Sequence, residues 1–549
     1  MLRETSMQPS KPLLTVAKKL ASNCRAAMAL HFVYIFWSIV ILYAGFIIYK
    51  SNFGMIDDWW LPDTILVGKK LPLWVIPQIG RFVVLPGQEY NLLSIISDKP
   101  RFFYTFNAIE LICTAWLLVQ TGKWGQKSKT STIPYIVTLL IMITPGFTDV
   151  WFRLFIPERS EMILLLIFIQ CYQQYLSTED KKYLVIGAIS ASLALLCKET
   201  AFILVGGFGV AGIVIGSRNK VRDVKCFVFD IAIILLSLLW VIIYYLIVYR
   251  FRGAHLYGAQ SDGYAFLVFK EILFSVIHDP VIIIGGCVLS YCRIFIMRCN
   301  LESESLMDIM LISSFGLIVA YAVLGMSSNW HLLPLYIFIP YIVSQVASNE
   351  TLMRPFRYRL SIVLWGLIAG QLLMGVSEVS ICKYSPNNFQ LMLSQLLSAI
   401  SESKHKANIY LAGVDRGSGV ELYLSLNAWL PYKGVSISSY DLRSDIRVVD
   451  KISFDQVMSR VPYKPFSYQS YGNIDKISKG AYVILTPYDT LSRRSEFEDA
   501  SKYRLYYKTN SITYSIVSVK SIVRMTGLAD KHGNGLDNVD PNYYIYIAL

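Results

Sequence analysis

Long apolar runs separated by short polar or basic stretches fill the chain from residue 28 to residue 376. The first run, residues 28–49, exceeds the about 20 residues that a helix needs to cross a bilayer. Further runs follow at 102–119, 133–143, 162–175, 183–197, 201–215, 227–249, 281–297, 306–324, 332–346 and 361–376. The pattern predicts a polytopic α-helical membrane protein with about 11 transmembrane helices.

The composition supports a membrane protein. Hydrophobic residues make up 54% of the 549 positions and charged residues only 16%, whereas a soluble protein of this length carries roughly 25% charge. The formal net charge of +13 could suggest nucleic acid as a partner. The basic residues, however, gather in the N-terminal arm and in short loops, which is typical of anchoring beside anionic lipid. We therefore expect no nucleic-acid binding.

The basic residues also predict the topology. The arm, residues 1–27, carries several of them, and residues 12–20 are expected to form a short interfacial helix. The loops are alternately rich and poor in Lys and Arg, so the N-terminus is predicted to be cytoplasmic. An odd number of spans then places the C-terminal part on the other side. The predicted parts are the arm, a membrane domain 28–377 with a long first outer loop 51–101, and a soluble domain 378–549.

The C-terminal part is polar and rich in tyrosine. Residues 408–414, 481–487, 503–507, 512–519 and 543–549 have the content of strands, and residues 419–430 that of a helix. Alternating strands and helices predict a small α/β domain. Nine cysteines are present, but no CxxC pair occurs, so neither a zinc site nor a disulfide framework is indicated.

An acidic pair, Asp57-Asp58, stands just after the first apolar run and directly before Trp59-Trp60. Two adjacent carboxylates among apolar residues at a membrane surface are costly, which favours a functional role over a solvated turn that ends a helix. For the two tryptophans, an interfacial aromatic belt competes with a stacking platform for sugar rings.

Other ionisable residues are predicted to gather at the same membrane face, because they fall in the candidate outer loops. They are Arg81, Glu89, Arg153, Glu158, Arg159, Glu161, Lys198, Glu199, Arg250, Arg252, His255 and His331. All but Arg81 and Glu89 have a structural alternative: a local salt-bridge network around residues 153–161, an ion pair within Lys198-Glu199, surface anchoring by Arg250 and Arg252, and hydrogen bonding by the histidines.

This layout resembles the GT-C superfamily of integral-membrane glycosyltransferases. The resemblance rests on Asp57-Asp58 in a long first outer loop, on the Lys198-Glu199-Thr200 turn after an apolar helix, and on a soluble C-terminal domain. Within the superfamily the chain looks most like bacterial O-antigen-modifying glucosyltransferases. The resemblance implies a bacterial inner-membrane enzyme with a periplasmic C-terminal domain. It would transfer a hexose, expected to be glucose, from undecaprenyl phosphate to a cell-surface polysaccharide such as the O-antigen of lipopolysaccharide, inverting the anomeric centre.

In the resembling family an acidic residue of the first outer loop is the general base, so the resemblance implies this role for Asp57 or Asp58. A carboxylate can take the proton of the attacking hydroxyl, while cations stabilise the phosphate that leaves. The candidates for phosphate contact are Arg153, Arg159, Lys198, Arg250, Arg252 and His331. Glu158, Glu161, Glu199, His255, Arg81 and Glu89 are expected to support them.

No cofactor is predicted to be required. An oxygen cage for Mg²⁺ or Mn²⁺ from Asp57-Asp58 with Asp149 or Glu161 stays open. The implied partners are the lipid-linked donor, the polysaccharide acceptor, the bilayer, a flippase and a donor-synthesising transferase. Three alternatives remain: a sibling transferase acting on lipid A, arabinan or protein, a transporter of lipid-linked sugar or polysaccharide, and an O-antigen polymerase. A transporter should show repeated halves and charges near the midplane, and a polymerase large internal loops; neither pattern is visible.

Overall fold

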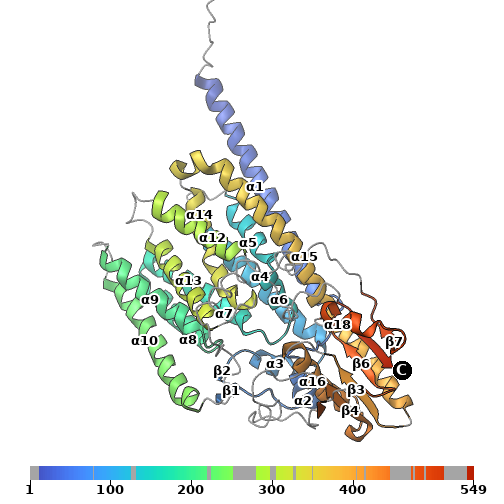
Figure 1. Ribbon diagram of the computed structural model, residues 1–549. Helices are drawn as coiled ribbons and strands as arrows, with labels where there is room; N and C mark the ends of the chain where they lie inside the picture. Colours follow the sequence, from blue (N-terminus) through green and yellow to red (C-terminus); the bar gives the residue numbers. More distant parts are fainter. Residues whose placement is uncertain are drawn as a thin grey trace, which may run out of the picture.

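The computed structural model has a helical body and a C-terminal sheet (Figure 1). It describes residues 11–77, 80–124, 131–218, 224–251, 280–296, 305–324, 329–348, 350–403, 405–412, 416–444, 472–473, 477–487, 490–511 and 541–549. The predicted strand 512–519, and the candidate site residues Arg252 and His255, lie outside these ranges.

The helical body follows the predicted apolar runs. Its helices are α1 (Lys11–Ile48), α4 (Pro100–Trp124), α5 (Ile133–Met142), α6 (Pro145–Phe152), α7 (Pro157–Thr178), α8 (Lys181–Leu195), α9 (Ala201–Arg218), α10 (Val224–Ile247), α12 (Pro280–Tyr291), α13 (Ser305–Leu324), α14 (Ile339–Ser348) and α15 (Glu350–Glu402). Short 3₁₀ helices η3 (Tyr249–Phe251) and η5 (Asn329–Ile337) and the π-helix η4 (Cys292–Ile296) complete it.

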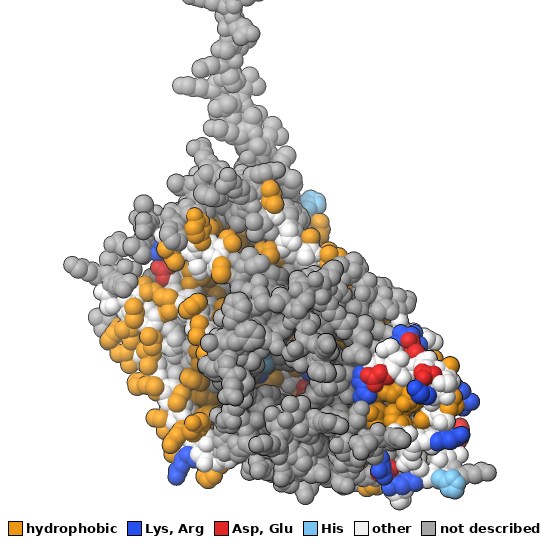
Figure 2. All heavy atoms as spheres, in the orientation of Figure 1, with side chains coloured by type: hydrophobic (Ala, Val, Ile, Leu, Met, Phe, Trp, Pro, Cys, Tyr) orange, Lys and Arg blue, Asp and Glu red, His pale blue; other side chains and the backbone are white. Residues whose placement is uncertain are grey.

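The described helices fit a polytopic membrane protein. Five of them are long and apolar enough to cross a membrane, or six if the bent pair α5 and α6 forms one span. Figure 2 shows apolar side chains gathered over the flank formed by α9 and α10, where Leu235, Leu239 and Ile242 are exposed. Such a surface is expected to face lipid tails. The count of about 11 spans stays a prediction.

Helix α1 differs from the predicted arm. Residues 12–20 were expected to form a separate interfacial helix, but Lys11–Ile48 is one continuous helix. The sequence explains the difference, because no proline or glycine interrupts the chain between Leu13 and Ala44.

A sharp bend separates α5 from α6. The two helices meet at 67°, and the break falls at Thr144, whose extended backbone precedes Pro145 at the first position of α6. Proline disfavours a helical conformation in the residue before it, so the sequence dictates the break. Gly375 of α15 packs directly on the carbonyl oxygen of Ile143, where any side chain would collide. The bend brings the fully buried helix α6 against α15.

The first outer loop carries its own short elements. These are α2 (Trp60–Asp63), η1 (Ile65–Val67), β1 (Trp74–Ile76), β2 (Arg81–Val83) and α3 (Gln88–Leu93). Strands β1 and β2 pair antiparallel, with Val75 opposite Phe82. The stretch around Trp74 is therefore one strand of a hairpin. Trp59 and Trp60 are buried and stack at 4.3 Å between ring centroids, so they form neither an exposed belt nor an exposed sugar platform.

The C-terminal part forms a six-stranded mixed sheet with the order β5-β4-β3-β6-β8-β7. Its elements are β3 (Ala407–Leu411), α16 (Arg416–Tyr432), η6 (Ile437–Ser439), β4 (Tyr440–Ser444), β5 (Gly472–Asn473), β6 (Tyr482–Leu485), α18 (Thr490–Phe497), β7 (Tyr503–Lys508) and β8 (Tyr544–Ala548). The strands from β5 to β6 run parallel, and β8 runs antiparallel to β6 and β7. Strands β3, β6, β7 and β8 and helix α16 lie where the sequence predicted strands and a helix, whereas β4, β5 and α18 were not predicted.

No break separates the helical body from this domain at residue 378. Helix α15 runs continuously through that position to Glu402. The N-terminal end of α1 and the sheet lie at opposite ends of the molecule, and α2 and α3 lie beside α16 at the sheet end (Figure 1). The acidic loop and the C-terminal domain thus share one end of the molecule, and their predicted place outside the membrane stays a prediction.

Candidate functional site

The acidic pair lies in the turn between α1 and α2. Asp57 adopts the left-handed conformation with φ of 60°, which is uncommon for a residue other than glycine. Its side chain is 33% exposed, whereas Asp58 is 3% exposed. The Gly54 backbone N–H donates a hydrogen bond to Asp58 Oδ2 at 2.5 Å. The turn therefore sends the two carboxylates into different surroundings.

Asp58 has an unusual electrostatic position. Its Oδ1 atom is buried and has no hydrogen-bond partner among the described residues. Burial raises the pKa of Asp58 to about 7; the hydrogen bond from Gly54 opposes this rise and the neighbouring Asp57 charge adds to it. A carboxyl group that titrates near neutrality can exchange a proton under physiological conditions.

A small pocket opens beside Asp58. Its walls come from the acidic turn, from α4, from the end of α6 and from α15. The lining residues are Gly54, Met55, Ile56, Asp58, Tyr104, Arg153, Cys382, Ser385 and Pro386. The pocket places a titratable carboxylate and a guanidinium in one cavity.

Arg153 joins the acidic turn to helix α6. Its Nη2 atom donates to Asp57 Oδ2 at 3.1 Å, and its Nη1 atom donates to Asp149 Oδ2 at 3.1 Å. Asp57 and Arg153 are 96 residues apart. Because each carboxylate binds a different nitrogen, the planar guanidinium is held in one orientation.

Arg159 is the centre of a second cluster. It is fully buried, and it donates to Glu110 Oε2 at 2.6 Å, to the Tyr90 hydroxyl at 2.8 Å and to Glu89 Oε1 at 3.4 Å. A further hydrogen bond of 3.2 Å to the Arg153 carbonyl oxygen connects the two clusters. All three nitrogens of this guanidinium donate hydrogen bonds to protein groups, as a buried charge requires.

Lys198 forms a third cluster with Glu158. Their side chains meet at 2.6 Å and are 3% and 0% exposed. His331 of η5 lies 3.9 Å from the same Glu158 oxygen and stacks on Tyr321. Glu161, one turn further along α7, is 1% exposed beside this pair.

Glu199 faces away from Lys198. It accepts hydrogen bonds from Arg81 at 3.5 Å and from the Phe82 backbone N–H at 2.9 Å. The ion pair considered within Lys198-Glu199 is therefore wrong, since each residue pairs with a distant partner. The local salt-bridge network considered for residues 153–161 is wrong too, because the ion-pair partners of Arg153, Glu158 and Arg159 lie outside that segment. Tertiary packing supplies partners that sequence neighbours cannot.

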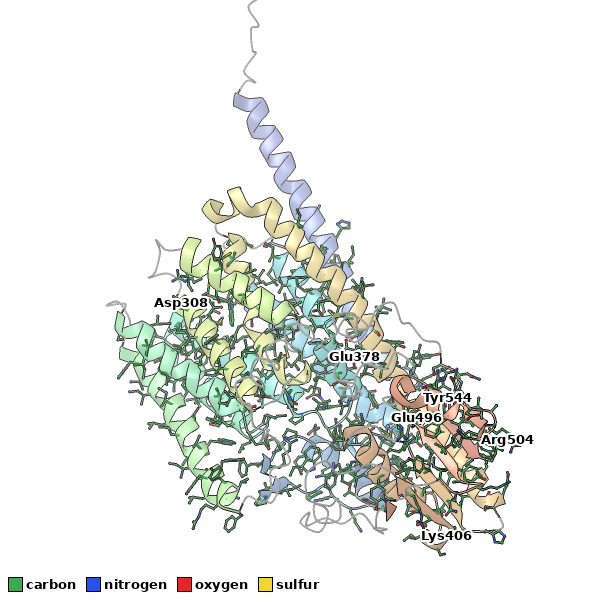
Figure 3. All side chains as sticks on the ribbon, in the orientation of Figure 1. Asp308, Glu378, Lys406, Glu496, Arg504 and Tyr544 are labelled. Atoms are coloured by element: carbon green, nitrogen blue, oxygen red, sulfur yellow. The ribbon has the colours of Figure 1, made fainter. Side chains whose placement is uncertain are left out.

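The structure brings most of the predicted site residues to one end of the body. Arg250 lies exposed on η3 after α10. The oxygen cage considered for Mg²⁺ or Mn²⁺ around Asp149 stays a prediction. The group that converges there is Asp149, Glu378 and Cys382. Another ion pair, between Arg293 and Asp308 at 2.6 Å, lies toward the end of the body away from the sheet (Figure 3).

Several residues escaped the sequence interpretation. Glu110 lies within the apolar run 102–119, where a carboxylate requires a partner, and only the structure identifies that partner as Arg159. Glu378 and Cys382 of α15 were not linked to the outer loops. Gln390 of α15 and Ser425 of α16 also went unnoticed, although both bind the acidic turn. No sequence signal marks them, because their function depends on contacts across hundreds of residues.

The C-terminal part holds the acidic turn directly. Gln390 Nε2 donates to the Phe53 carbonyl oxygen at 3.0 Å, and Ser425 Oγ donates to the Met55 carbonyl oxygen at 2.5 Å. The Trp429 ring of α16 lies 6.0 Å from the Phe53 ring. The backbone of the turn that carries the two carboxylates is thus held by contacts from α15 and α16.

Comparison with known proteins does not identify the family of this chain. No protein-family model matches the chain, and no curated protein matches it. Among the solved structures that match is the crystal structure of ArnT from Cupriavidus metallidurans bound to undecaprenyl phosphate. The match has a TM-score of 0.43 and 10% identity, and covers 85% of this chain and 95% of that one. At these values it does not establish a common site.

Proposed function

We propose that this protein is a membrane glycosyltransferase that takes a sugar from a polyprenyl-phosphate carrier. The observation that carries the proposal is the meeting of Asp58 and Arg153 in one pocket at the end of the helical body. Glycosyl transfer from a lipid phosphate needs a base for the acceptor hydroxyl and a cation for the leaving phosphate. The pocket offers one of each.

Asp58 is the proposed base. Its partnerless Oδ1 atom and its pKa of about 7 suit it to accept a proton from the acceptor hydroxyl as that oxygen attacks the anomeric carbon. Asp57 has the second role, since its carboxylate holds Arg153. One carboxylate thus acts on the substrate while its neighbour orients the cation.

Arg153 is the proposed phosphate contact, because it lines the pocket and its side chain is 13% exposed. The guanidinium can bind two phosphate oxygens at once. Arg159 and Lys198 are enclosed by carboxylates. They position the loops and helices around the pocket. His331 keeps its proposed role as a second phosphate contact, and Arg81, whose side chain is 26% exposed, is proposed to support the site.

The substrates follow the resemblance described above. The donor is proposed to be undecaprenyl-phosphate glucose and the acceptor a cell-surface polysaccharide such as O-antigen. The reaction would take place at the periplasmic face of a bacterial inner membrane. Direct displacement by the acceptor would invert the anomeric centre.

The test is transfer of labelled sugar from undecaprenyl phosphate by the full-length protein in lipid nanodiscs. Purified O-antigen, lipid A and water serve as separate acceptors. Asp58→Asn is expected to lower kcat by about 100- to 10,000-fold while donor binding persists. Arg153→Lys is expected to weaken donor binding, because a lysine ammonium cannot bind two phosphate oxygens with two parallel N–H groups as the planar guanidinium does.

Asp98→Asn, a change in the same outer loop but away from the pocket, is the control and should transfer normally. Transfer to lipid A in place of O-antigen would keep the reaction and change the acceptor. Wild-type transfer rates in Asp57→Asn and Asp58→Asn alike would refute the proposed base.

A further inference from the structure

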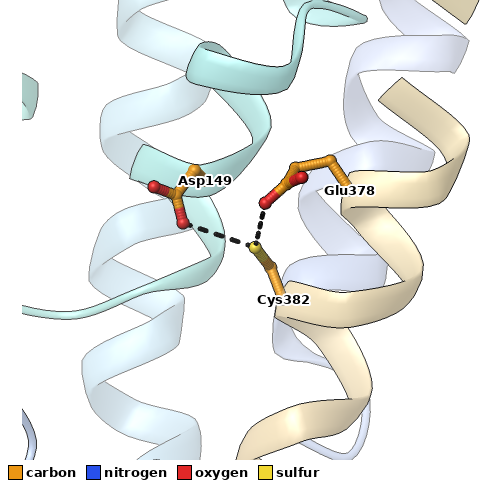
Figure 4. Close-up of side chains that lie close together, drawn as sticks. All are labelled: Asp149, Glu378 and Cys382. Atoms are coloured by element: carbon orange, nitrogen blue, oxygen red, sulfur yellow. Dashed lines mark hydrogen bonds between the residues drawn. The ribbon is translucent and has the colours of Figure 1, made fainter. Parts of the chain in front are cut away.

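Three potential metal ligands converge between α6 and α15. The Cys382 Sγ atom lies 3.4 Å from Asp149 Oδ1 and 3.3 Å from Glu378 Oε1, and all three ligand atoms lie within 4.8 Å of one another (Figure 4). Asp149 comes from the short buried helix α6, and the other two residues are one turn apart on α15. The three side chains point toward a common centre (Figure 4).

These spacings match the coordination sphere of a small divalent ion. Zinc binds cysteine sulfur at about 2.3 Å and carboxylate oxygen at about 2.0–2.2 Å, so tetrahedral geometry separates sulfur from oxygen by about 3.5 Å. The observed sulfur–oxygen distances of 3.4 and 3.3 Å are slightly shorter than this, so the ligands need to move apart only a little to hold such an ion. A thiolate among the ligands favours zinc over magnesium or calcium, which prefer oxygen alone.

Two of the three residues are buried, so the state of the thiol depends on what lies beside it. Asp149 is 5% exposed and Cys382 is 6% exposed. Burial raises the pKa of the Cys382 thiol, and the Glu378 and Asp149 carboxylates raise it further. A divalent cation would reverse that balance, because a coordinating thiol gives up its proton to the solvent.

A second observation comes from the adjoining pocket. Cys382 lines the pocket that also contains Asp58. Asp58 is only 3% exposed, and its Oδ1 atom has no hydrogen-bond partner among the residues described. An unsatisfied buried oxygen beside an incomplete ligand set indicates that something polar occupies this space. Three protein ligands with an open fourth position are typical of an accessible zinc site.

We propose that Asp149, Glu378 and Cys382 bind a divalent transition-metal ion such as Zn²⁺, with its fourth coordination position facing the Asp58 pocket. The ion joins α6 to α15. It also fixes Asp149, which holds the Arg153 guanidinium at 3.1 Å. The metal therefore positions the cation of the pocket. The proposal does not depend on glycosyl transfer, since metal binding is measured directly.

The competing interpretation is a protonated thiol whose single S–H donates to one of the two carboxylates or is shared between them. Sulfur–oxygen distances of 3.3–3.4 Å suit that arrangement as well. A hydrogen-bonded thiol retains its proton and takes up no ion, whereas a metal-bound one is a thiolate. The two interpretations therefore differ in stoichiometry and in absorption spectrum.

The experiment uses the full-length protein in detergent, stripped with a chelator and titrated with Co²⁺, a coloured substitute for Zn²⁺. One equivalent is expected to bind and to produce a thiolate-to-cobalt absorption band, which Zn²⁺ then removes. Cys382→Ser should abolish the band. The matched control is Cys171→Ser, a change of another buried helical cysteine, which should leave the band intact.

Glu378→Gln keeps every cysteine and guards against a Cys382→Ser variant that fails to fold. It is expected to weaken Co²⁺ binding by about tenfold or more. A wild-type protein without the band overturns the proposal, and so does a band that both Cys382→Ser and Glu378→Gln leave unchanged. If metal binds as proposed but sugar transfer is absent, the metal site stands and the proposed enzyme function fails.

Discussion

Gln390 Nε2 donates a hydrogen bond to the carbonyl oxygen of Phe53 at 3.0 Å, across 337 residues of sequence. Phe53 stands four residues before Asp57, and Gln390 lies on the part of α15 that leads into the C-terminal sheet. The Ser425 hydroxyl makes the equivalent bond to Met55 from α16. The acidic turn and the soluble domain are therefore one connected unit.

Gln390→Met tests this connection. The change preserves side-chain length but removes the donor, so the Phe53 carbonyl loses a partner. We expect a loss of about 1 kcal/mol in stability. We also expect kcat to fall about tenfold, because a shift of the turn would misalign the Asp58 carboxylate with the acceptor hydroxyl. Donor KM should stay constant. Ser394→Ala on the exposed face of the same helix is the control, and equal kcat in both variants would contradict a positioning role.

The pH dependence of transfer reports on Asp58. Only its ionised form can accept a proton, so the rate should rise with pH through about 7 and then level off. Asp57→Asn removes a negative charge that raises the pKa of Asp58 and frees Arg153 to interact with it. The rising limb of the pH–rate profile should therefore move to lower pH. A limb that stays in place would show that another group controls the rate.

Asp58 also links stability to pH. Its folded pKa of about 7 exceeds the ordinary 3.8, so its favourable contribution is complete at low pH and is lost as pH rises through 7. Asn at this position is neutral at every pH. The Asp58→Asn variant should therefore be more stable than wild type at pH 8, by on the order of 2 kcal/mol in the free energy of unfolding. Its thermal unfolding midpoint should be correspondingly higher. The difference should shrink toward pH 4; a difference that grows on acidification would reverse the assignment.

The buried pair Lys198–Glu158 provides a double-variant test. Lys198→Met leaves a carboxylate of 0% exposure without its cation, which is expected to cost about 3–5 kcal/mol. Adding Glu158→Gln removes the stranded charge and should restore most of the stability. If Lys198 only positions the helices, sugar transfer recovers too. Lys182→Met, which breaks a solvent-exposed pair with Asp180, should leave the stability nearly unchanged.

Recovery of stability without recovery of donor KM in the double variant would show that Lys198 contacts the donor phosphate. That outcome would replace the positioning role argued above.

Gly375→Ala tests the bend between α5 and α6. The added methyl group would collide with the Ile143 carbonyl oxygen, and such overpacking typically costs about 1–3 kcal/mol. Gly370→Ala, five residues earlier on α15, meets nothing within 4 Å and should stabilise the helix slightly. Equal unfolding midpoints of the two variants would show that the close approach is unimportant.

The sequence by itself determined the elements of this protein. Apolar runs place the helices of the body because lipid-compatible helices must satisfy their own backbone groups. Pro145 and Thr144 specify the break before α6, and the β-branched stretches around Val483 and Ile545 specify strands of the sheet. The pattern also separated Asp57-Asp58 from ordinary turns, because carboxylates beside tryptophans at a membrane surface are costly.

Only the tertiary structure decided the partners of the charged residues. Asp57 binds Arg153, Glu110 binds Arg159, and Lys198 binds Glu158. Sequence proximity suggested different pairs, because a charge in a low-dielectric interior takes whichever opposite charge the packing of distant helices brings within reach. The same packing placed Cys382 and Glu378 beside Asp149 and set Asp58 apart from Asp57. Helix periodicity carries no information about these contacts, since it describes one helix and not its neighbours.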